Sequence, residues 1–474
     1  MLLDKIFYKI KKIIPMSIFK KIQPIYHWII SFLAYLIYSN PSQEIIVIGI
    51  TGTTGKTTTT YLIAKMLENN GFKVGFTSTA LFNNGKKEWL NNKKMTMLGR
   101  FFTQKILRQM VKNGCQYAII ETTSEGIRQY RHQFINYDLL VFTGLYPEHI
   151  ESHGSFENYK KTKQKLFQHL EKCFFKYVDE QKKVIKIQNN LKKLDLNKIK
   201  KTIIVNGNDE HYQDFIKFWA EDKIIVNINQ ENNQIKEKDF IKKIIVQDQD
   251  IIVNQKGLSF NVFTENESEK FNLQLLGKFN VHNILSVIAI GLNQGLSLLQ
   301  IENGLEKISG IPGRLEKINQ GQNFTIIVDY AFEPVAVSKL YETIKSIPYN
   351  KIIHVLGSAG GGRDKARRPE LGKIAGKNAD YVIITNEDPY DEDPQEIIEQ
   401  IFIGAEQMNK IENKNLFKII DRHQAIEKAL SLANPNDIVL ITGKGSEQSI
   451  CIANNEKIPF DDREVVKNLI NLKK

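Results

Sequence analysis

Short apolar runs alternate with stretches of helical periodicity from residue 44 onward. The runs are rich in isoleucine and valine and predict strands at 44–50, 74–78, 117–122 and 139–143. Helical periodicity predicts helices at 57–69, 101–112 and 156–171. Strands that alternate with helices are typical of a mostly parallel sheet with helices on both faces. We therefore predict an α/β fold whose functional residues lie at the C-terminal ends of the strands.

A second α/β unit is predicted after residues 309–313, where glycine and proline indicate a hinge. Its predicted strands are 324–329, 351–356, 380–385 and 437–441, and its predicted helices are 334–346, 394–407 and 422–432. Residues 180–275 hold short β-like runs and are interpreted as the far part of the first unit, with an antiparallel section. The predicted organisation is a short helical segment over 1–43, a first unit over 44–310 and a Rossmann-like second unit over 311–474.

The first 43 residues combine basic and apolar character. Six lysines precede the apolar run 25–38, namely Lys5, Lys9, Lys11, Lys12, Lys20 and Lys21. The run is shorter than the ~20 residues of a spanning helix, and no small-x-small cleavage site follows it. Two interpretations stay open: a helix packed on the next unit, which we favour slightly, and a peripheral membrane contact through residues 1–40.

Composition narrows the class of protein further. The net charge is +12, but lysine, isoleucine and asparagine are frequent throughout, and no RNA-binding aromatic signature accompanies the lysines. We therefore predict no nucleic-acid partner. Three scattered cysteines are too few for a disulfide framework or a metal knuckle and are typical of a reducing, cytoplasmic compartment.

The segment Gly49-Ile-Thr-Gly-Thr-Thr-Gly-Lys-Thr57 lies between a predicted strand and a predicted helix. In that context glycines let backbone N–H groups surround phosphate oxygens, and the helix N-terminus adds partial positive charge. Lys56 can reach the outer phosphates, and the Thr57 hydroxyl can bind Mg²⁺. Ile50 stands where the common phosphate loop has a glycine, so this loop is a tighter variant.

Polar residues follow other predicted strands. Glu121 ends one strand and is placed to hold Mg²⁺, and His149 follows another, where it could bind a metal or orient a water. In the second unit, Arg314 lies in the hinge and Asp329 ends a strand. The loops 357–364 and 442–447 also follow strands, which predicts a cleft that closes on an anionic substrate.

These segments resemble, in order, the motifs of the Mur ligase family over about residues 44–460, and most closely those of its UDP-N-acetylmuramoyl-tripeptide synthetase branch. The matching motifs are Thr51–Thr57, Glu121–Ser124, Gln129–Arg131, 142–159, Gly277–Asn283, Pro312–Glu316, Asp329–Ala331, Gly360–Lys365, Glu392–Pro394 and Gly443–Gly445. Two departures matter. The branch normally has a separate uridine-binding domain where this chain has residues 1–43, and Tyr390 replaces the arginine associated with diaminopimelate.

The resemblance implies an ATP-dependent ligase that forms an acyl phosphate and then an amide bond in peptidoglycan precursor synthesis. It implies ATP contacts at Gly52, Thr53, Thr54, Gly55, Lys56, Thr57, Thr58, Asn283, Arg314 and Asp329. Implied metal ligands are Thr57, Glu121, His149 and Lys163, of which Lys163 matches the lysine that the family carbamylates. Lys56, Lys163, His149 and Arg314 are the implied catalytic residues. Implied substrate contacts are Thr123, Ser124, Gln129 and Arg131 for the UDP-muramyl peptide, and Arg363, Asp388 and Glu447 for the amino acid.

Three functional hypotheses are carried forward. The first is addition of the third residue to a UDP-N-acetylmuramoyl dipeptide by a monomer. The second is a relative with another carboxylate acceptor, as in folylpolyglutamate or poly-amino-acid synthesis. The third is a nucleotide-binding module without turnover, anchored through residues 1–40.

Overall fold

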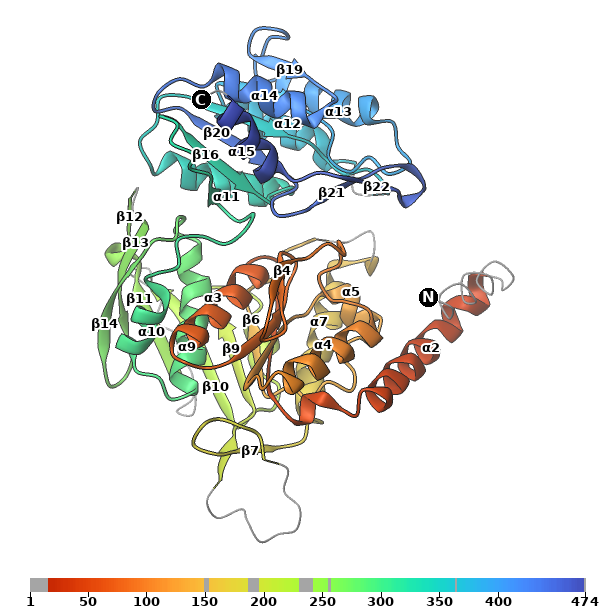
Figure 1. Ribbon diagram of the computed structural model, residues 1–474, viewed down its shortest axis with the longest axis vertical. Coiled ribbons are helices and arrows are strands. Elements are labelled where there is room, and N and C mark those ends of the chain that lie inside the picture. The colour runs from red at the N-terminus through yellow and green to blue at the C-terminus, as the bar shows by residue number, and fades with distance from the viewer. Residues whose placement is uncertain are drawn as a thin grey trace.

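The computed structural model describes residues 16–148, 153–185, 196–229, 242–254, 257–362 and 365–472. Its ribbon forms two bodies, one around a large sheet and one around a smaller sheet (Figure 1). We call them the first unit and the second unit. The helix α2 (Met16–Ile37) lies at the side of the first unit.

The large sheet has twelve strands within the described residues, in the order β12-β13-β11-β10-β9-β6-β1-β5-β2-β3-β4, with β14 beside β13. Strand β1 (Ile46–Thr51) lies between the parallel neighbours β5 (Tyr117–Glu121) and β6 (Leu139–Phe142). The other strands are β2 (Val74–Thr77), β3 (Leu81–Asn83), β4 (Glu88–Leu90), β9 (Thr202–Asn206), β10 (Asp222–Asn229), β11 (Lys242–Gln247), β12 (Ile252–Asn254), β13 (Gly257–Phe263) and β14 (Ser268–Leu273). Because β12, β13 and β14 pair antiparallel, the predicted antiparallel section is confirmed.

Helices cover both faces of this sheet. Alternate residues of β1 belong to two different cores: Ile46, Ile48 and Ile50 to one, and Val47 to the other. The first core includes α3 (Lys56–Asn69), α9 (Asn280–Asn293) and α10 (Leu298–Leu305), and the second includes α4 (Arg100–Lys112) and α7 (Phe156–Leu170). Burial on both faces explains why the strands read as continuous apolar runs.

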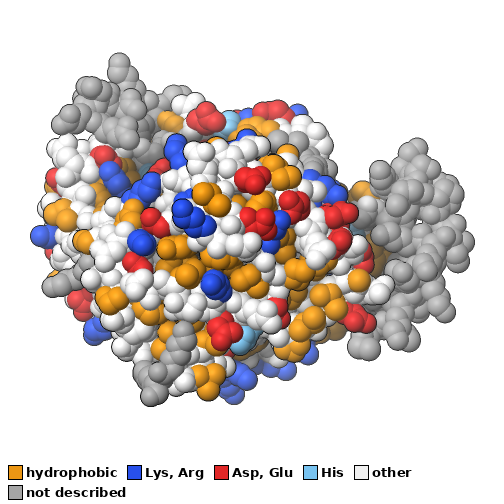
Figure 2. All heavy atoms as spheres, turned by 90° about the horizontal axis from the view of Figure 1, so that it is seen from above, with side chains coloured by type: hydrophobic (Ala, Val, Ile, Leu, Met, Phe, Trp, Pro, Cys, Tyr) orange, Lys and Arg blue, Asp and Glu red, His pale blue; other side chains and the backbone are white. Residues whose placement is uncertain are grey.

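The second unit has a six-stranded sheet in the order β15-β16-β20-β17-β18-β19. Its strands are β15 (Glu316–Lys317), β16 (Thr325–Asp329), β17 (Ile352–Leu356), β18 (Tyr381–Ile384), β19 (Leu416–Lys418) and β20 (Ile438–Thr442). Helices α11 (Pro334–Lys345), α12 (Arg367–Asn378) and α13 (Pro394–Glu406) pack on one face, and α14 (Arg422–Leu432) and α15 (Asp462–Leu472) pack on the other. Acidic and basic side chains are interspersed on the face seen in Figure 2.

The predicted helices and strands are confirmed with boundaries that differ by one or two residues, a difference typical of helix ends. Helices α9, α10, α12 and α15 were not predicted, nor were the short helices at Ser124–Arg128 and Gln213–Ile216. Nearly every residue of α9 is buried, so it lacks a polar face. Two glycines and a proline weaken the helical signal of α12, but Gly372 lets its backbone approach Ile401 of α13.

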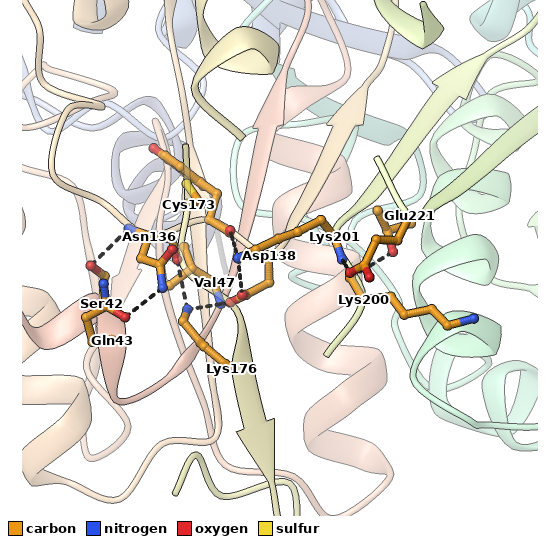
Figure 3. Close-up of polar contacts among 12 residues, drawn as sticks. Ser42, Gln43, Val47, Asn136, Asp138, Cys173, Lys176, Lys200, Lys201 and Glu221 are labelled. Carbon is orange, nitrogen blue, oxygen red and sulfur yellow. Dashed lines mark hydrogen bonds and ion pairs between the residues drawn. The ribbon is translucent and has the colours of Figure 1, made fainter. Parts of the chain in front are cut away.

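A buried ionic cluster lies at the N-terminal ends of strands in the first sheet, whereas the phosphate loop follows the C-terminal end of β1 (Figure 3). The Asp138 carboxylate accepts hydrogen bonds from the backbone N–H of Val47 at 2.8 Å, from Lys176 Nζ at 2.5 Å and from Lys201 Nζ at 2.8 Å. All three charged side chains are at most 1% exposed. The cluster therefore ties the segment before β6 to β1, to β7 (Lys176–Val178) and to the segment before β9.

Helix α2 packs on α4, as the favoured interpretation predicted. Ser31 Oγ donates to the carbonyl oxygen of Tyr130 at 2.9 Å, and the rings of Trp28, Phe32 and Tyr35 contact Phe134. The helix also exposes apolar side chains, namely Ile25, Trp28, Ile29, Leu33, Leu36 and Ile37. Among the described helices, none is both long and apolar enough to cross a membrane.

Candidate active site

The phosphate loop connects β1 to α3. Gly55 precedes α3 with φ of 80°, and a Cβ there would collide with Oδ1 of Asn283, so only glycine fits. Lys56 Nζ donates to the carbonyl oxygen of Thr53 at 2.6 Å. Ile50 is buried within β1, and the loop therefore begins later than in the common phosphate loop. Helix α3 begins directly after this loop, and the N-terminus of a helix suits a bound phosphate.

Two side chains with metal-binding oxygens meet beside this loop. Thr57 Oγ1 donates to Glu121 Oε2 at 3.0 Å, and Glu121 also accepts from the backbone N–H of Thr79 at 2.7 Å. In the parallel pairing of β1 with β5, Glu121 lies opposite Ile50, so its carboxylate lies at the C-terminal ends of the strands, next to β1. Glu121 is 1% exposed, and its hydrogen bonds hold it in place. Hydroxyl and carboxylate oxygens are a donor set that Mg²⁺ accepts.

Lys163 of α7 lies fully buried beneath the loop. Its Nζ donates to the carbonyl oxygen of Gly52 at 2.7 Å and lies 4.6 Å from the ring centroid of Tyr159. Burial, together with the charge of Lys56, lowers the pKa of Lys163 well below its usual value. A lowered lysine pKa favours the neutral amine, which is the nucleophilic form of the side chain.

The hinge and the end of β16 approach the loop from the second unit. The Asp329 carboxylate accepts from the backbone N–H groups of Leu315 and Ala331, each at 2.7 Å. Burial raises the pKa of Asp329, and the charge of Arg314 opposes that rise. The Arg314 guanidinium lies over the ring of Tyr330, 4.2 Å from its centroid. Asp329 therefore fixes the hinge that presents Arg314.

A cavity of about 470 Å³ lies between the two units and is lined by both. Predicted site residues line it from both sides: Thr53, Thr54, Gly55, Lys56, Thr57, Thr58, Glu121, Thr123, Asn283, Arg314 and Asp329. Its volume is in the range of pockets that hold a nucleotide-sized ligand. The structure thus brings the phosphate loop, the Thr57–Glu121 pair and the hinge arginine around one space.

The predicted amino-acid contacts form a cluster of charges at the junction of the units. Lys94, from the loop before α4, contacts Asp388 Oδ2 at 2.7 Å and Glu447 Oε2 at 3.1 Å. Lys444 Nζ bridges the same carboxylates at 3.1 and 3.0 Å. Glu387 is buried beside them, and burial raises the pKa of its carboxyl group. Lys94 also lines the cavity, which connects this cluster to the phosphate loop.

The predicted acceptor contacts lie on and after α5 (Ser124–Arg128). Thr123 caps this helix by accepting from the N–H of Gly126 at 3.1 Å, and the Ser124 hydroxyl is 3.1 Å from His153 Nε2. Gln129 and Arg131 follow the helix and contact each other, with Arg131 Nη2 donating to Gln129 Oε1 at 2.7 Å. Of these four residues only Thr123 lines the cavity itself.

Two predicted site residues, His149 and Arg363, lie outside the described residues. Sequence reasoning also missed three residues that the structure places at the site: Thr79 on Glu121, Tyr159 beneath the loop, and Lys94. These residues contact Glu121, Thr53 and Asp388, respectively, far away in the chain, so no local spacing marks them. Only the occurrence of Thr79 just after a strand is a weak signal.

Both units of the chain match known protein families. Residues 50–236 and 192–291 match the Mur ligase middle domain, and residues 313–445 match the Mur ligase glutamate ligase domain. A UDP-N-acetylmuramyl-tripeptide synthetase from Roseiflexus sp. is 34% identical over 432 residues, which are 91% of this chain and 79% of the relative. A similarly named synthetase from Borreliella burgdorferi is 34% identical over 439 residues, 92% of this chain and 78% of the relative.

Solved structures show the same fold. The structure of a UDP-N-acetylmuramoyl-L-alanyl-D-glutamate–2,6-diaminopimelate ligase is 26% identical, with a TM-score of 0.57, and the match covers 91% of this chain and 79% of that one. Folylpolyglutamate synthase from Mycobacterium tuberculosis, solved with ADP and AMPPCP, has a TM-score of 0.61 at 14% identity, over 87% of this chain and 91% of that one. The latter similarity concerns the fold alone.

Proposed function

Because this chain belongs to the Mur ligase family, whose members are ATP-dependent amide-bond ligases, we propose that it extends a UDP-N-acetylmuramoyl dipeptide by one amino acid. The observation that supports this most directly is the cavity shared by the phosphate loop, the Thr57–Glu121 pair and the hinge. We assign residues 44–310 to ATP binding and residues 311–474 to amino-acid binding.

In the proposed reaction, the γ-phosphoryl group of ATP passes to the acceptor carboxylate and ADP is released. The amine of the amino acid then attacks the acyl phosphate carbon, and inorganic phosphate leaves. Phosphoryl transfer needs positioning and charge neutralisation more than covalent catalysis. Lys56 and Arg314, one from each unit, line the cavity and supply positive charge from opposite sides.

Mg²⁺ would neutralise phosphate charge when bound, and Thr57 and Glu121 are the described residues that would hold it. His149 is assigned to the same task from its position in the family motif alone. Asn283 holds the start of α3 through Thr59, at 3.3 Å, and is assigned to ATP. Among the described residues no group of three histidine, cysteine or acidic side chains is arranged as a metal cage. A shared site of protein and phosphate oxygens fits this pattern.

We further assign Lys163 as a carbamylated lysine. A neutral Lys163 amine can add CO₂ and release one proton, which converts the buried amine into a carbamate whose oxygens can bind a metal. Its lowered pKa and its position next to the loop support this. Ligase activity should therefore fall in CO₂-depleted buffer and recover with bicarbonate. Activity that is unchanged in CO₂-depleted buffer, or that falls and does not recover with bicarbonate, would contradict the assignment.

The acceptor is assigned to Thr123, Ser124, Gln129 and Arg131, and the amino acid to Asp388, Glu447 and Arg363. The carboxylates of Asp388 and Glu447 are balanced by Lys94 and Lys444. We also propose that the protein acts as a monomer. Light scattering of the purified protein tests the oligomeric state.

Phosphate release tests the function directly. Muramyl and folyl acceptors are crossed with a panel of amino acids in the presence of ATP and Mg²⁺. We expect release only when a UDP-muramyl dipeptide and one amino acid are both present. Absence of release with every muramyl acceptor would rule the proposal out, and release with a folyl acceptor would favour the second hypothesis.

We also propose a cytoplasmic location with peripheral membrane contact. Six lysines and one acidic residue within residues 1–40 flank the exposed apolar side chains of α2, a pattern that suits an anionic bilayer surface. Sedimentation with phosphatidylglycerol vesicles should recover the protein, whereas phosphatidylcholine vesicles should not. Ile29→Glu should abolish recovery. Ile403→Glu is the matched control, since both side chains are 45% exposed. Equal recovery of the two variants would contradict the proposal.

A further inference from the structure

Two arginines converge where α2 meets the first unit. Arg100 begins α4, and its Nη2 donates to the carbonyl oxygen of Gln129 at 2.5 Å. Arg131 Nη2 donates to the side-chain oxygen of the same glutamine at 2.7 Å. His27 of α2 lies next to them: Ser31 Oγ donates both to the His27 carbonyl oxygen and to that of Tyr130, each at 2.9 Å. The side chains of Arg100, Arg131 and His27 therefore lie close together around residues 129–130.

Several of these nitrogens are buried without a hydrogen-bond partner among the described residues. They are Nε of Arg100, Nε of Arg131 and both ring nitrogens of His27. Unpaired buried donors are costly, and native proteins keep few of them. The nearby carboxylate of Glu125 is already bound by Arg128 at 2.8 Å and by Gln129 at 2.5 Å. The cluster thus holds positive charge that these contacts leave unbalanced.

The electrostatics of the cluster agree with its geometry. Burial lowers the pKa of Arg100 to about 10, and the charge of Arg131 contributes to that shift. Burial and the charges of Arg100 and Arg131 lower the pKa of His27 to about 4. The first turn of α4 has neither a side-chain cap nor an acidic residue, so its N–H groups add partial positive charge beside Arg100. An anion would relieve both the repulsion and the missing hydrogen bonds.

The cluster lies next to the cavity. Arg131 also donates to the carbonyl oxygen of Met97, and the preceding residues Lys94 and Thr96 line the cavity. Thr123, which caps α5 just before Gln129, lines it as well. A ligand whose reactive group occupies the cavity can therefore extend along these two segments to the arginines.

We propose that Arg100 and His27 join Arg131 in a second anion site, which binds an anionic group of the acceptor outside the phosphate loop. The inference rests on the proposed function, because that function supplies an acceptor with two kinds of anion, a diphosphate and peptide carboxylates. Both can accept the forked hydrogen bonds of guanidinium groups. Helix α2 then contributes a ligand-binding residue in addition to its packing role.

Calorimetric titration distinguishes the diphosphate from the peptide carboxylates as the bound anion. The ATP site is first saturated with a non-hydrolysable ATP analogue and Mg²⁺. The ligands are the intact UDP-muramyl dipeptide, UDP-N-acetylglucosamine, which lacks the peptide, and muramoyl dipeptide, which lacks the diphosphate. Arg100→Gln and His27→Gln should each weaken binding of the intact acceptor by about 10-fold or more, the size expected for a lost charge-assisted hydrogen bond. Weaker binding of one fragment alone identifies the diphosphate or the carboxylate as the bound group.

Lys105→Gln is the matched control, since it removes one positive charge from the exposed side of the same helix. Should Arg100→Gln unfold by circular dichroism, the half-buried His27→Gln decides alone. Unchanged affinity for the intact acceptor in the folded variants overturns the assignment, as does a wild-type protein that binds none of the three ligands. The titrations need no turnover, so a failure of the proposed function, seen as absent phosphate release, is distinguishable from a failure of the anion site.

Discussion

Lys94→Met tests whether one lysine holds the two units together. Lys94 belongs to the first unit, and its ammonium contacts Asp388 and Glu447 of the second. Its side chain is only 10% exposed, so solvent and salt screen these contacts weakly. Burial alone would lower the pKa of Lys94, but the carboxylates of Glu447 and Asp388 outweigh burial and raise it. Methionine keeps the length of the side chain and removes its charge.

The expected effect can be estimated from the contacts. Hydrogen bonds to charged groups contribute roughly 1.5–3 kcal/mol each, and loss of one partner of a buried pair costs roughly 3–5 kcal/mol. Lys444 remains on both carboxylates, at 3.1 and 3.0 Å, and reduces that cost. We therefore expect the closed arrangement to lose about 2 kcal/mol, which corresponds to about a 30-fold change in the open-to-closed ratio.

Fluorescence energy transfer between one labelled surface position in each unit measures that ratio. Lys94→Met should shift the distribution toward longer distances, and its apparent affinity for substrates should fall because fewer molecules are closed. Lys93→Met is the matched control, since Lys93 is the exposed neighbour. Identical distance distributions for the two variants would refute the assignment of Lys94 as a bridge between the units.

Further predictions concern the site and the core. Lys163→Ala should abolish phosphate release but leave ATP affinity within about threefold, because Lys163 is not among the residues that line the cavity, and titration with an ATP analogue checks this. Asp138→Asn should lower the free energy of unfolding in urea by about 3–5 kcal/mol, because two buried lysines lose their counter-charge. Burial lowers the folded-state pKa of Lys176 to about 8 from 10.5, so the unfolded chain binds more protons between these values. Stability should therefore rise from pH 8 to pH 10.5, as measured by urea unfolding across that window. Lys94→Met and Arg100→Gln should be non-additive in kcat/KM for the acceptor, as measured in a double-mutant cycle, because the loop that carries Lys94 runs directly into α4, which Arg100 begins.

The elements that could be predicted from the sequence are those with local causes. Strand β1, the turn at Gly52 and Gly55, and the start of α3 follow one another within a few residues, and each residue type fits its own backbone. The strand-end position of Glu121 follows equally from an apolar run that stops at a carboxylate. Such features need no knowledge of the rest of the fold.

Other elements depend on contacts that no local pattern contains. Helix α12 forms although its sequence is a poor helix former, because its glycines permit close packing against α13. Lys163 is one lysine among several on α7, and only its burial beneath Gly52 distinguishes it. Lys94 meets Asp388 across 294 positions of sequence. Long-range contacts of this kind become visible only in the folded structure.

The segment 94–100 connects two features that were described separately. At one end Lys94 contacts the second unit, and at the other Arg100 lies in the proposed anion site. Thr96, between them, faces the cavity and shares a hydrogen bond of 2.8 Å with Thr79, which in turn holds Glu121. An acceptor anion bound by Arg100 would therefore restrain the same short segment that carries the bridge to the amino-acid unit. Because a restrained segment loses less conformational entropy on forming the Lys94 contacts, acceptor binding should favour closure of the units before the amino acid reacts.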